Sequence, residues 1–210
     1  TTLGMMNNQV WHDDPRRLVF TLSPYKFVAK LLAGKQRVLE VGCGDAFASR
    51  IVKQEVQNLT VIDFDPIFIA DIQERADSQW PMKAAVHDMF AGSYSDSFDA
   101  IYSLDVLEHI DAANEIKFIE NILESLDPNG VLIVGMPSLE SQSYASPQSK
   151  IGHVNCKSGK DLQALFERYF HNVFLFSMND EVVHTGYTPM AHYIIAVCST
   201  PKSTTRVSAG

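Results

Sequence analysis

The chain has 210 residues, enough for one α/β domain of ordinary size and too few for two. Its 46% hydrophobic and 20% charged residues are typical of a globular protein with a substantial core. A formal net charge of −8 argues against a dedicated nucleic-acid or anionic-membrane binder, and three scattered cysteines argue against a disulfide framework or a thiolate zinc site.

Short apolar runs alternate with helical patterns along most of the chain. In the first half, the pattern predicts helices over 15–21 and 24–32, a strand over 37–41, a helix over 46–56, a strand over 59–64, a helix over 66–79, and strands over 83–87 and 98–104. In the second half, it predicts a helix over 111–126, a strand over 131–136, a helix that begins at the capping signature of Ser158 and Asp161, and strands over 172–177 and 191–198.

This alternation is typical of a parallel sheet that carries helices on both faces. The last two strands are joined by about a dozen residues without a helical stripe, which favours an antiparallel pair. We therefore predict an α/β fold with a doubly wound, mostly parallel seven-stranded sheet and a C-terminal antiparallel strand pair. One domain should cover residues 10–199, with disordered tails over 1–9 and 200–210.

A glycine-rich turn follows the first predicted strand in the segment VLEVGCGDA, residues 38–46. Gly42 and Gly44 would let the backbone approach a ligand closely at the carboxyl end of the strand. A dinucleotide fingerprint would need a small residue at position 47, where this chain has Phe47. An NAD-dependent oxidoreductase is therefore disfavoured.

Acidic residues near the predicted strand ends favour a different ligand. Glu40 would repel a pyrophosphate but attract the ammonium of an amino acid, and Asp63, at the end of the second strand, can accept both hydroxyls of a ribose. Asp88, after the third strand, could accept from the exocyclic amine of adenine. A ligand with an adenine, a ribose, an amino-acid tail and no phosphate describes S-adenosylmethionine.

On these motifs the chain resembles the class I methyltransferases that depend on S-adenosylmethionine, with a Rossmann-like fold. The resemblance is good over residues 36–137 and looser over 10–198, and Ala46 stands where the family usually has a third glycine. The five matching motifs, in order, are VLEVGCGDA (38–46), VIDFDP (61–66), HDMF (87–90), FDAIYSLDVLEHI (98–110) and LDPNGVLIVGMPS (126–138).

The resemblance implies a role for each cofactor-binding position. Gly42, Cys43 and Gly44 would shape the loop against the methionine part, and an N-terminal helix would bring Tyr25 or Arg16 near its carboxylate. The remaining contacts would come from the strand ends. The residues implied there are Glu40, Asp63 and Phe64, Asp88 and Met89, and Ser103 and Leu104, the last two near the sulfonium.

Candidate catalytic side chains cluster in LDVLEHI and GHVN. Asp105, Glu108 and His109 would share one face of a short helix or turn after the fourth strand, and His153 could join them. The pattern is similar to the metal-binding E-x-x-E-H of small-RNA 2′-O-methyltransferases and ubiquinone-pathway O-methyltransferases. We favour His109 or His153 as a catalytic base over a divalent metal held by the cluster, for which these four residues are only candidates.

Two irregular polar segments, residues 139–155 and 179–190, are predicted to form acceptor-specificity loops. We therefore predict an enzyme that O- or N-methylates a small polar metabolite, such as a sugar or biosynthetic intermediate, and releases S-adenosylhomocysteine. The alternatives are a non-catalytic regulatory module that binds S-adenosylmethionine, or a metal-assisted RNA 2′-O-methyltransferase, which the net charge disfavours. With no membrane-length apolar run and no N-terminal signal sequence, a cytoplasmic location without membrane partners is expected, and the oligomeric state is left open.

Overall fold

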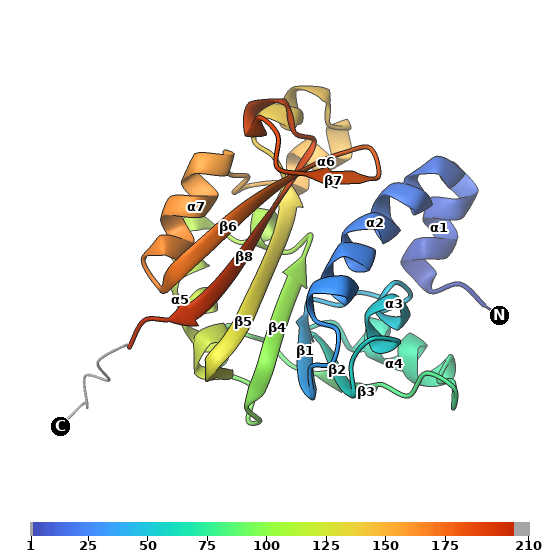
Figure 1. Cartoon of the computed structure of the whole chain (residues 1–210). Helices are drawn as coiled ribbons and strands as arrows, with labels where there is room; N and C mark the ends of the chain where they lie inside the picture. The colour runs from blue at the N-terminus through green and yellow to red at the C-terminus, as the bar shows by residue number, and fades with distance from the viewer. Residues whose placement is uncertain (1, 204–210) are drawn as a thin grey trace.

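A computed structural model describes residues 2–203 (Figure 1). Its central sheet has eight strands in the order β3-β2-β1-β4-β5-β8-β6-β7. The strands are β1 (Arg37–Val41), β2 (Asn58–Asp63), β3 (Lys83–Val86), β4 (Phe98–Leu104), β5 (Leu126–Pro137), β6 (Phe170–Asn179), β7 (Val182–His184) and β8 (Tyr193–Pro201). The first five pair in parallel, and β8 runs antiparallel to both β5 and β6.

Helices cover both faces of the sheet. The α-helices are α1 (Met5–Asp13), α2 (Pro15–Leu31), α3 (Ser49–Lys53), α4 (Pro66–Glu74), α5 (Ala112–Glu124), α6 (Pro147–Gly152) and α7 (Gly159–Glu167). Residues 2–203 also contain three short 3₁₀ helices: η1 (Leu107–His109), η2 (Glu140–Tyr144) and η3 (Thr188–Met190). None of the helices within residues 2–203 has the length and hydrophobicity of a membrane-spanning segment.

Successive side chains of the buried strands point to opposite faces of the sheet and pack into two separate hydrophobic cores. Leu39 and Ile101 pack with α5 and α7 on one face, while Val38 and Ala100 pack with α2, α3 and α4 on the other. Because both faces are covered, the central strands are apolar nearly throughout, as the sequence pattern indicated. The predicted doubly wound α/β fold and its antiparallel C-terminal pair are confirmed.

The predicted number of strands is wrong by one. The eighth strand is β7, a three-residue strand that pairs with the end of β6 inside the segment expected to be an irregular loop. A run this short carries no periodic signal of its own. It forms because the tight turn at Asp180, whose φ is +49°, folds it back onto β6.

The N-terminal region also differs from the prediction. Residues 5–9, expected in a disordered tail, belong to α1, and the two short helices expected over 15–32 form the single helix α2. Pro24 lies inside α2 and is buried, so packing against the sheet offsets the backbone hydrogen bond that a proline cannot donate. At the other end, β8 continues to Pro201, into the tail predicted over 200–210, and residues 204–210 lie outside the described part of the chain.

The order of the strands determines where a ligand can bind. From β1 the chain builds outward through β2 to β3, and it then returns to the other side of β1 with β4 and β5. The carboxyl ends of β1 and β4 therefore diverge into loops on opposite sides, and open α/β sheets bind ligands in the crevice at such a switch point.

Candidate functional site

The loop after β1 has an unusual backbone that only small residues adopt readily. Gly42, Gly44 and Ala46 have φ values of +75°, +51° and +47°, all in the left-handed region. A Cβ atom on Gly42 would also collide with the Cγ2 atom of Val106. Ala46, where the third family glycine is replaced, adopts the glycine-like conformation despite its methyl group, so the loop keeps its shape at the expense of local strain.

Asp63, the last residue of β2, supports this loop. Its Oδ2 accepts from the Gly44 amide at 2.9 Å and its Oδ1 accepts from the Asp65 amide at 3.0 Å. The residue is 7% exposed. Each carboxylate oxygen retains a second acceptor position, so the carboxylate can hold the loop and still accept a ribose hydroxyl.

Glu40 lies deeper than the sequence suggested. Its carboxylate accepts hydrogen bonds from the Tyr25 hydroxyl at 3.0 Å and the Tyr102 hydroxyl at 2.6 Å, and the residue is 1% exposed. Burial raises the pKa of Glu40 to about 7. The expected direct contact with a ligand ammonium is therefore not formed in this geometry, and Tyr25, rather than Glu40, reaches the cavity described next.

A cavity of about 110 Å³ lies between the glycine loop and the N-terminal helices. Its lining residues are Met6, Asn7, Thr21, Tyr25, Gly42, Cys43, Gly44, Asp45, Phe47, Ala48, Leu104 and Asp105. Its volume is below the roughly 300 Å³ of the smallest usual ligand pockets. Within residues 2–203, no Lys or Arg side chain lines it.

Helix α1 closes this cavity. The Asn7 amide donates to Asp45 Oδ2 and its side-chain Nδ2 donates to Asp45 Oδ1, both at 2.8 Å. The Met6 side chain lies directly over Gly44. Figure 1 shows α1 beside α2, at the carboxyl-end side of β1. Sequence reasoning missed Met6 and Asn7, because the residues of α1 show no apolar stripe. It missed the role of Asp45 because its partner Asn7 lies 38 positions away in the chain.

The residues expected to contact adenine lie near the ends of β2 and β3. Phe64 is 74% exposed, so its ring is available to a ligand. Asp88 is exposed, and its Oδ1 accepts from the Phe90 amide at 2.8 Å, which leaves Oδ2 available. The Met89 side chain is buried, and its carbonyl accepts a hydrogen bond from Asn121.

The two residues expected near the sulfonium have different surroundings. Leu104 ends β4 and lines the cavity. Ser103 is buried, and its hydroxyl donates to the Val41 carbonyl at 3.0 Å. The Ser103 side chain therefore joins β4 to β1 and does not line the cavity, a correction to the expected ligand contact.

Asp105 and Glu108 follow β4 on the same rim. Asp105 lines the cavity with φ at +56°, and desolvation in this recess raises its pKa to about 6. Glu108 is 1% exposed, and burial together with the charge of Asp105 raises its pKa well above the usual value. The two carboxyl groups therefore interact electrostatically, with Asp105 exposed at the rim and Glu108 buried behind it.

The structure brings Glu108, His109 and His153 together, with one potential ligand atom of each lying within 4.8 Å of the others. The Nδ1 atoms of both histidines already bind oxygen acceptors, the Gly152 carbonyl for His109 and Gln142 Oε1 for His153, each at 2.8 Å. The hydrogen on each Nδ1 leaves Nε2 with a free lone pair. Asp105 is not part of this group.

These three side chains could hold a divalent ion as well as move a proton. In support of a metal, Glu108 Oε2 is buried without a hydrogen-bond partner among the described residues, and acceptors that orient Nδ1 are usual around metal-binding histidines. In support of a base, desolvation and the neighbouring His109 lower the pKa of His153, which keeps its imidazole neutral near pH 7.

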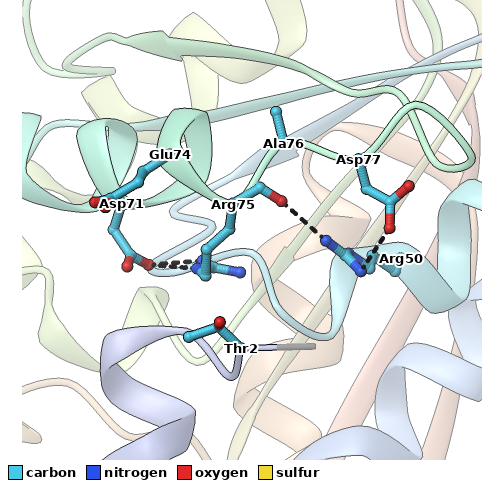
Figure 2. Close-up of a pocket in the computed structure, with 7 residues that line it drawn as sticks. All are labelled: Thr2, Arg50, Asp71, Glu74, Arg75, Ala76 and Asp77. Atoms are coloured by element: carbon cyan, nitrogen blue, oxygen red, sulfur yellow. Dashed lines mark hydrogen bonds and ion pairs between the residues drawn. The ribbon is translucent and has the colours of Figure 1, made fainter.

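A larger pocket of about 360 Å³ lies on the other side of the glycine loop, between α3 and α4 (Figure 2). Its charged side chains are largely paired with one another. Arg75 binds Asp71 at 2.6 Å and Arg50 binds Asp77 at 3.4 Å. Arg75 also donates to the Asp45 carbonyl, so this cluster supports the glycine loop from behind.

Sequence comparison relates this chain to known methyltransferases. Residues 10–170 match a family model described as a methyltransferase domain. A mitochondrial ubiquinone biosynthesis O-methyltransferase of Schizosaccharomyces pombe is 24% identical over 103 residues, which are 47% of this chain and 37% of that protein. Nodulation protein S of Rhizobium tropici is 28% identical over 138 residues, 62% of this chain and 58% of that protein. The chain thus spans less than two thirds of these curated relatives.

A solved structure shares the fold over nearly the whole chain. The N-methyltransferase NodS from Bradyrhizobium japonicum, in complex with S-adenosyl-L-homocysteine, aligns with a TM-score of 0.66 and 18% sequence identity. The alignment covers 91% of each chain. At this identity the match reports the architecture, and the chemistry of the site rests on the residues described above.

Proposed function

The chain belongs to the methyltransferase domain family, and on this premise we propose that it transfers the methyl group of S-adenosylmethionine to a small polar acceptor. The observation that carries the proposal is the chemistry of the cavity at the glycine loop. Its charged lining residues are acidic, Asp45 and Asp105, and no basic side chain from residues 2–203 reaches it. Such a lining disfavours a diphosphate and favours a cationic, phosphate-free donor.

In this proposal, each part of the donor binds at the carboxyl end of a different strand. The loop of Gly42, Cys43 and Gly44 holds the methionine part, and Asp63 holds the ribose. Adenine lies against Phe64, between Asp88 and the backbone of Met89. Tyr25 and Leu104 line the space around the sulfonium. The side chains of Glu40 and Ser103 do not contact the donor. Glu40 positions Tyr25, and Ser103 positions the ends of β1 and β4.

The residues beyond β4 would act on the acceptor. Alignment and exclusion of water can lower the barrier by about 7–11 kcal/mol, and a base near neutral pKa adds roughly 10²–10⁴-fold. His153 is neutral and has a free Nε2 atom, so in this proposal it is the base that takes the proton from the acceptor. His109 packs against it with the ring centroids 5.2 Å apart and completes the catalytic pair.

The two segments proposed as acceptor loops border this pair. Residues 139–155 form η2 and α6 and carry His153, while residues 179–190 form β7 and η3, and η2 and η3 contact each other. Exposed polar side chains from both segments suit a small polar acceptor. A net charge of −8 makes RNA the less favourable partner.

The decisive test is isothermal titration calorimetry with S-adenosylhomocysteine. We expect binding by the wild-type protein and at least tenfold weaker binding by Asp63→Asn. Asp65→Asn is the matched control, because its side chain caps α4 and asparagine caps a helix equally well. His153→Gln should retain the affinity. A folded wild-type protein that does not bind would refute the function, and equal losses in the Asp63 and His153 variants would refute the division of roles.

The Glu108, His109 and His153 cluster favours one second candidate, a metal-assisted transfer. A divalent ion held by these three residues would lower the pKa of an acceptor hydroxyl. Calorimetry with Mn²⁺ tests this without turnover. Micromolar binding that His153→Gln weakens at least tenfold would establish the metal site, whereas binding that is absent or unchanged in the variant would leave the histidines as acid–base groups.

A further inference from the structure

The segment that carries His153 is a loop whose two ends are joined at its base. Ser138 and Lys157 form an isolated parallel β-bridge, and the Lys157 carbonyl accepts from the Leu139 amide at 2.8 Å. Residues 138–157 are called the His153 loop below. Within it, Nδ1 of His153 bonds Gln142 Oε1 at 2.8 Å, so the imidazole is fixed to its own loop. The position of His153 in the site therefore depends on how this loop docks on the rest of the domain.

Two contacts join the His153 loop to the segment that carries His109. The Asn155 amide donates to the Glu108 carbonyl at 2.9 Å, and Nδ1 of His109 bonds the Gly152 carbonyl at 2.8 Å. These contacts lie on either side of His153 in the chain. Helix η1, which carries Glu108 and His109, leads into α5 after two residues. The loop can therefore be held in place either at η1 or at the first turn of α5.

Three side chains form a closed ring of hydrogen bonds between the His153 loop and α5. Glu115 Oε2 accepts from Asn155 Nδ2 at 2.7 Å and from Lys157 Nζ at 2.6 Å, and Lys157 Nζ also donates to Asn155 Oδ1 at 2.8 Å. Glu115 and Asn155 are each 8% exposed. Glu115 is the charged residue on the buried face of α5, whose other members are Phe118, Ile119 and Ile122. A charged group thus occupies a position where the helix otherwise packs apolar side chains.

Stability alone does not account for a polar ring at this place. Apolar side chains of similar volume often give equal or greater stability than a buried ion pair. Hydrogen bonds act only over a narrow range of distances and angles, so the ring fixes the direction from which the loop approaches α5. The ring begins at Asn155, two residues after His153. Because a misplacement of about 1 Å can lower a rate by about 100-fold, this fixed docking bears directly on catalysis.

We propose that Glu115, Asn155 and Lys157 are positioning residues, which hold the His153 loop on α5 so that His153 faces His109. This inference rests on the proposed function, in which His153 is the base that takes the proton from the acceptor. None of the three side chains lines the donor cavity. They therefore affect the acceptor half of the reaction and leave the binding of the donor unchanged.

Nuclear magnetic resonance can observe the docking without a known acceptor. The rings of His109 and His153 have their centroids 5.2 Å apart, so their carbon-bound protons should give a nuclear Overhauser cross-peak in histidine-labelled protein. The signals are assigned by their disappearance in His109→Gln and His153→Gln. This cross-peak reports the relative position of the two imidazoles, which a general loss of stability does not change in molecules that remain folded.

Asn155→Ser is the variant that opens the ring. Serine is too short to bridge Glu115 and Lys157, but their direct ion pair remains, so the protein should fold. We expect this variant to lose the cross-peak and to bind S-adenosylhomocysteine within twofold of wild type. Asn172→Ser is the matched control, because it removes an asparagine hydrogen bond at an exposed position of β6, and it should keep the cross-peak.

The double variant Glu115→Gln with Asn155→Asp tests rescue. It exchanges donor and acceptor between the two positions and keeps one carboxylate beside Lys157, so it should regain the cross-peak. The positioning role would be overturned by a folded Asn155→Ser protein that keeps the cross-peak, even if its urea midpoint falls, or by a double variant that fails to regain it. The double variant decides alone if Asn155→Ser does not fold. Failure of the folded wild-type protein to bind S-adenosylhomocysteine would instead overturn the proposed function, and with it the catalytic meaning of the docking.

Discussion

Replacing Glu40 with glutamine should change how the stability of the protein depends on pH. Glu40 is fully enclosed, and its carboxyl group meets the hydroxyls of Tyr25 and Tyr102. Burial raises its pKa from an ordinary value of 4.5 to about 7 in the folded protein. Glutamine has nearly the same shape and does not ionise, so Glu40→Gln removes the titration and retains most of the packing.

The sign follows from proton linkage. Between pH 4.5 and about pH 7 the folded state binds more protons than the unfolded state, so Glu40 makes the free energy of unfolding fall as the pH rises. A difference of about 2.5 pKa units at 1.36 kcal/mol each corresponds to roughly 3 kcal/mol. Relative to wild type, Glu40→Gln should therefore gain up to about 3 kcal/mol between pH 4 and pH 8.

Urea denaturation of both proteins at pH 4 and pH 8 measures this difference, and the other titrating groups cancel because both proteins contain them. Glu124→Gln on the exposed face of α5 is the control and should show the same pH dependence as wild type. The reasoning fails if the stability gap between Glu40→Gln and wild type stays constant within about 0.5 kcal/mol across this range.

Three further predictions test the loop, the closing helix and the metal. Gly42→Ala should lose at least about 2 kcal/mol in urea denaturation, more than Gly34→Ala, which has a similar φ of +83° but open space around it; equal losses would exclude the collision with Val106. Asn7→Ala should raise the association rate of S-adenosylhomocysteine severalfold in stopped-flow measurements, because it releases α1 from Asp45; an unchanged rate would show that α1 does not limit entry. Treatment with EDTA should leave the affinity for S-adenosylhomocysteine unchanged within twofold by calorimetry, and a larger loss would mean that a metal shapes the donor site.

The strands beside the site could be predicted well from sequence. The bounds of β1 and β4 agree with the predicted ranges, since each is a short apolar run that ends at a turn or loop. Helix α1 could not be predicted, because its residues lack an apolar stripe. It is instead held by the hydrogen bonds of Asn7 to Asp45, which is 38 positions away in the chain.

The site residues also divide into those that spacing along the chain predicts and those whose surroundings only the fold explains. The positions of Gly42, Gly44 and Asp63 follow from their spacing around β1 and β2, and the structure brings them together through the Gly44–Asp63 hydrogen bond. The surroundings of Glu40 do not follow from spacing, because its two partners lie 15 and 62 positions away. Because Glu40 is buried, it supports Tyr25 and does not make the expected contact with the ligand.

The amino-acid sequence by itself determined the alternation of most strands and helices, the switch point with its glycine loop, and the identity of several groups gathered there, among them Gly42, Gly44 and Asp63. These properties depend on local periodicity and on residue spacing, both of which can be read along the chain. Only the tertiary structure decided which carboxylates face the cavity, which pKa values are raised, and that His109, His153 and Glu108 meet. Desolvation and hydrogen bonding depend on all neighbours in space, and most of those neighbours are distant in sequence.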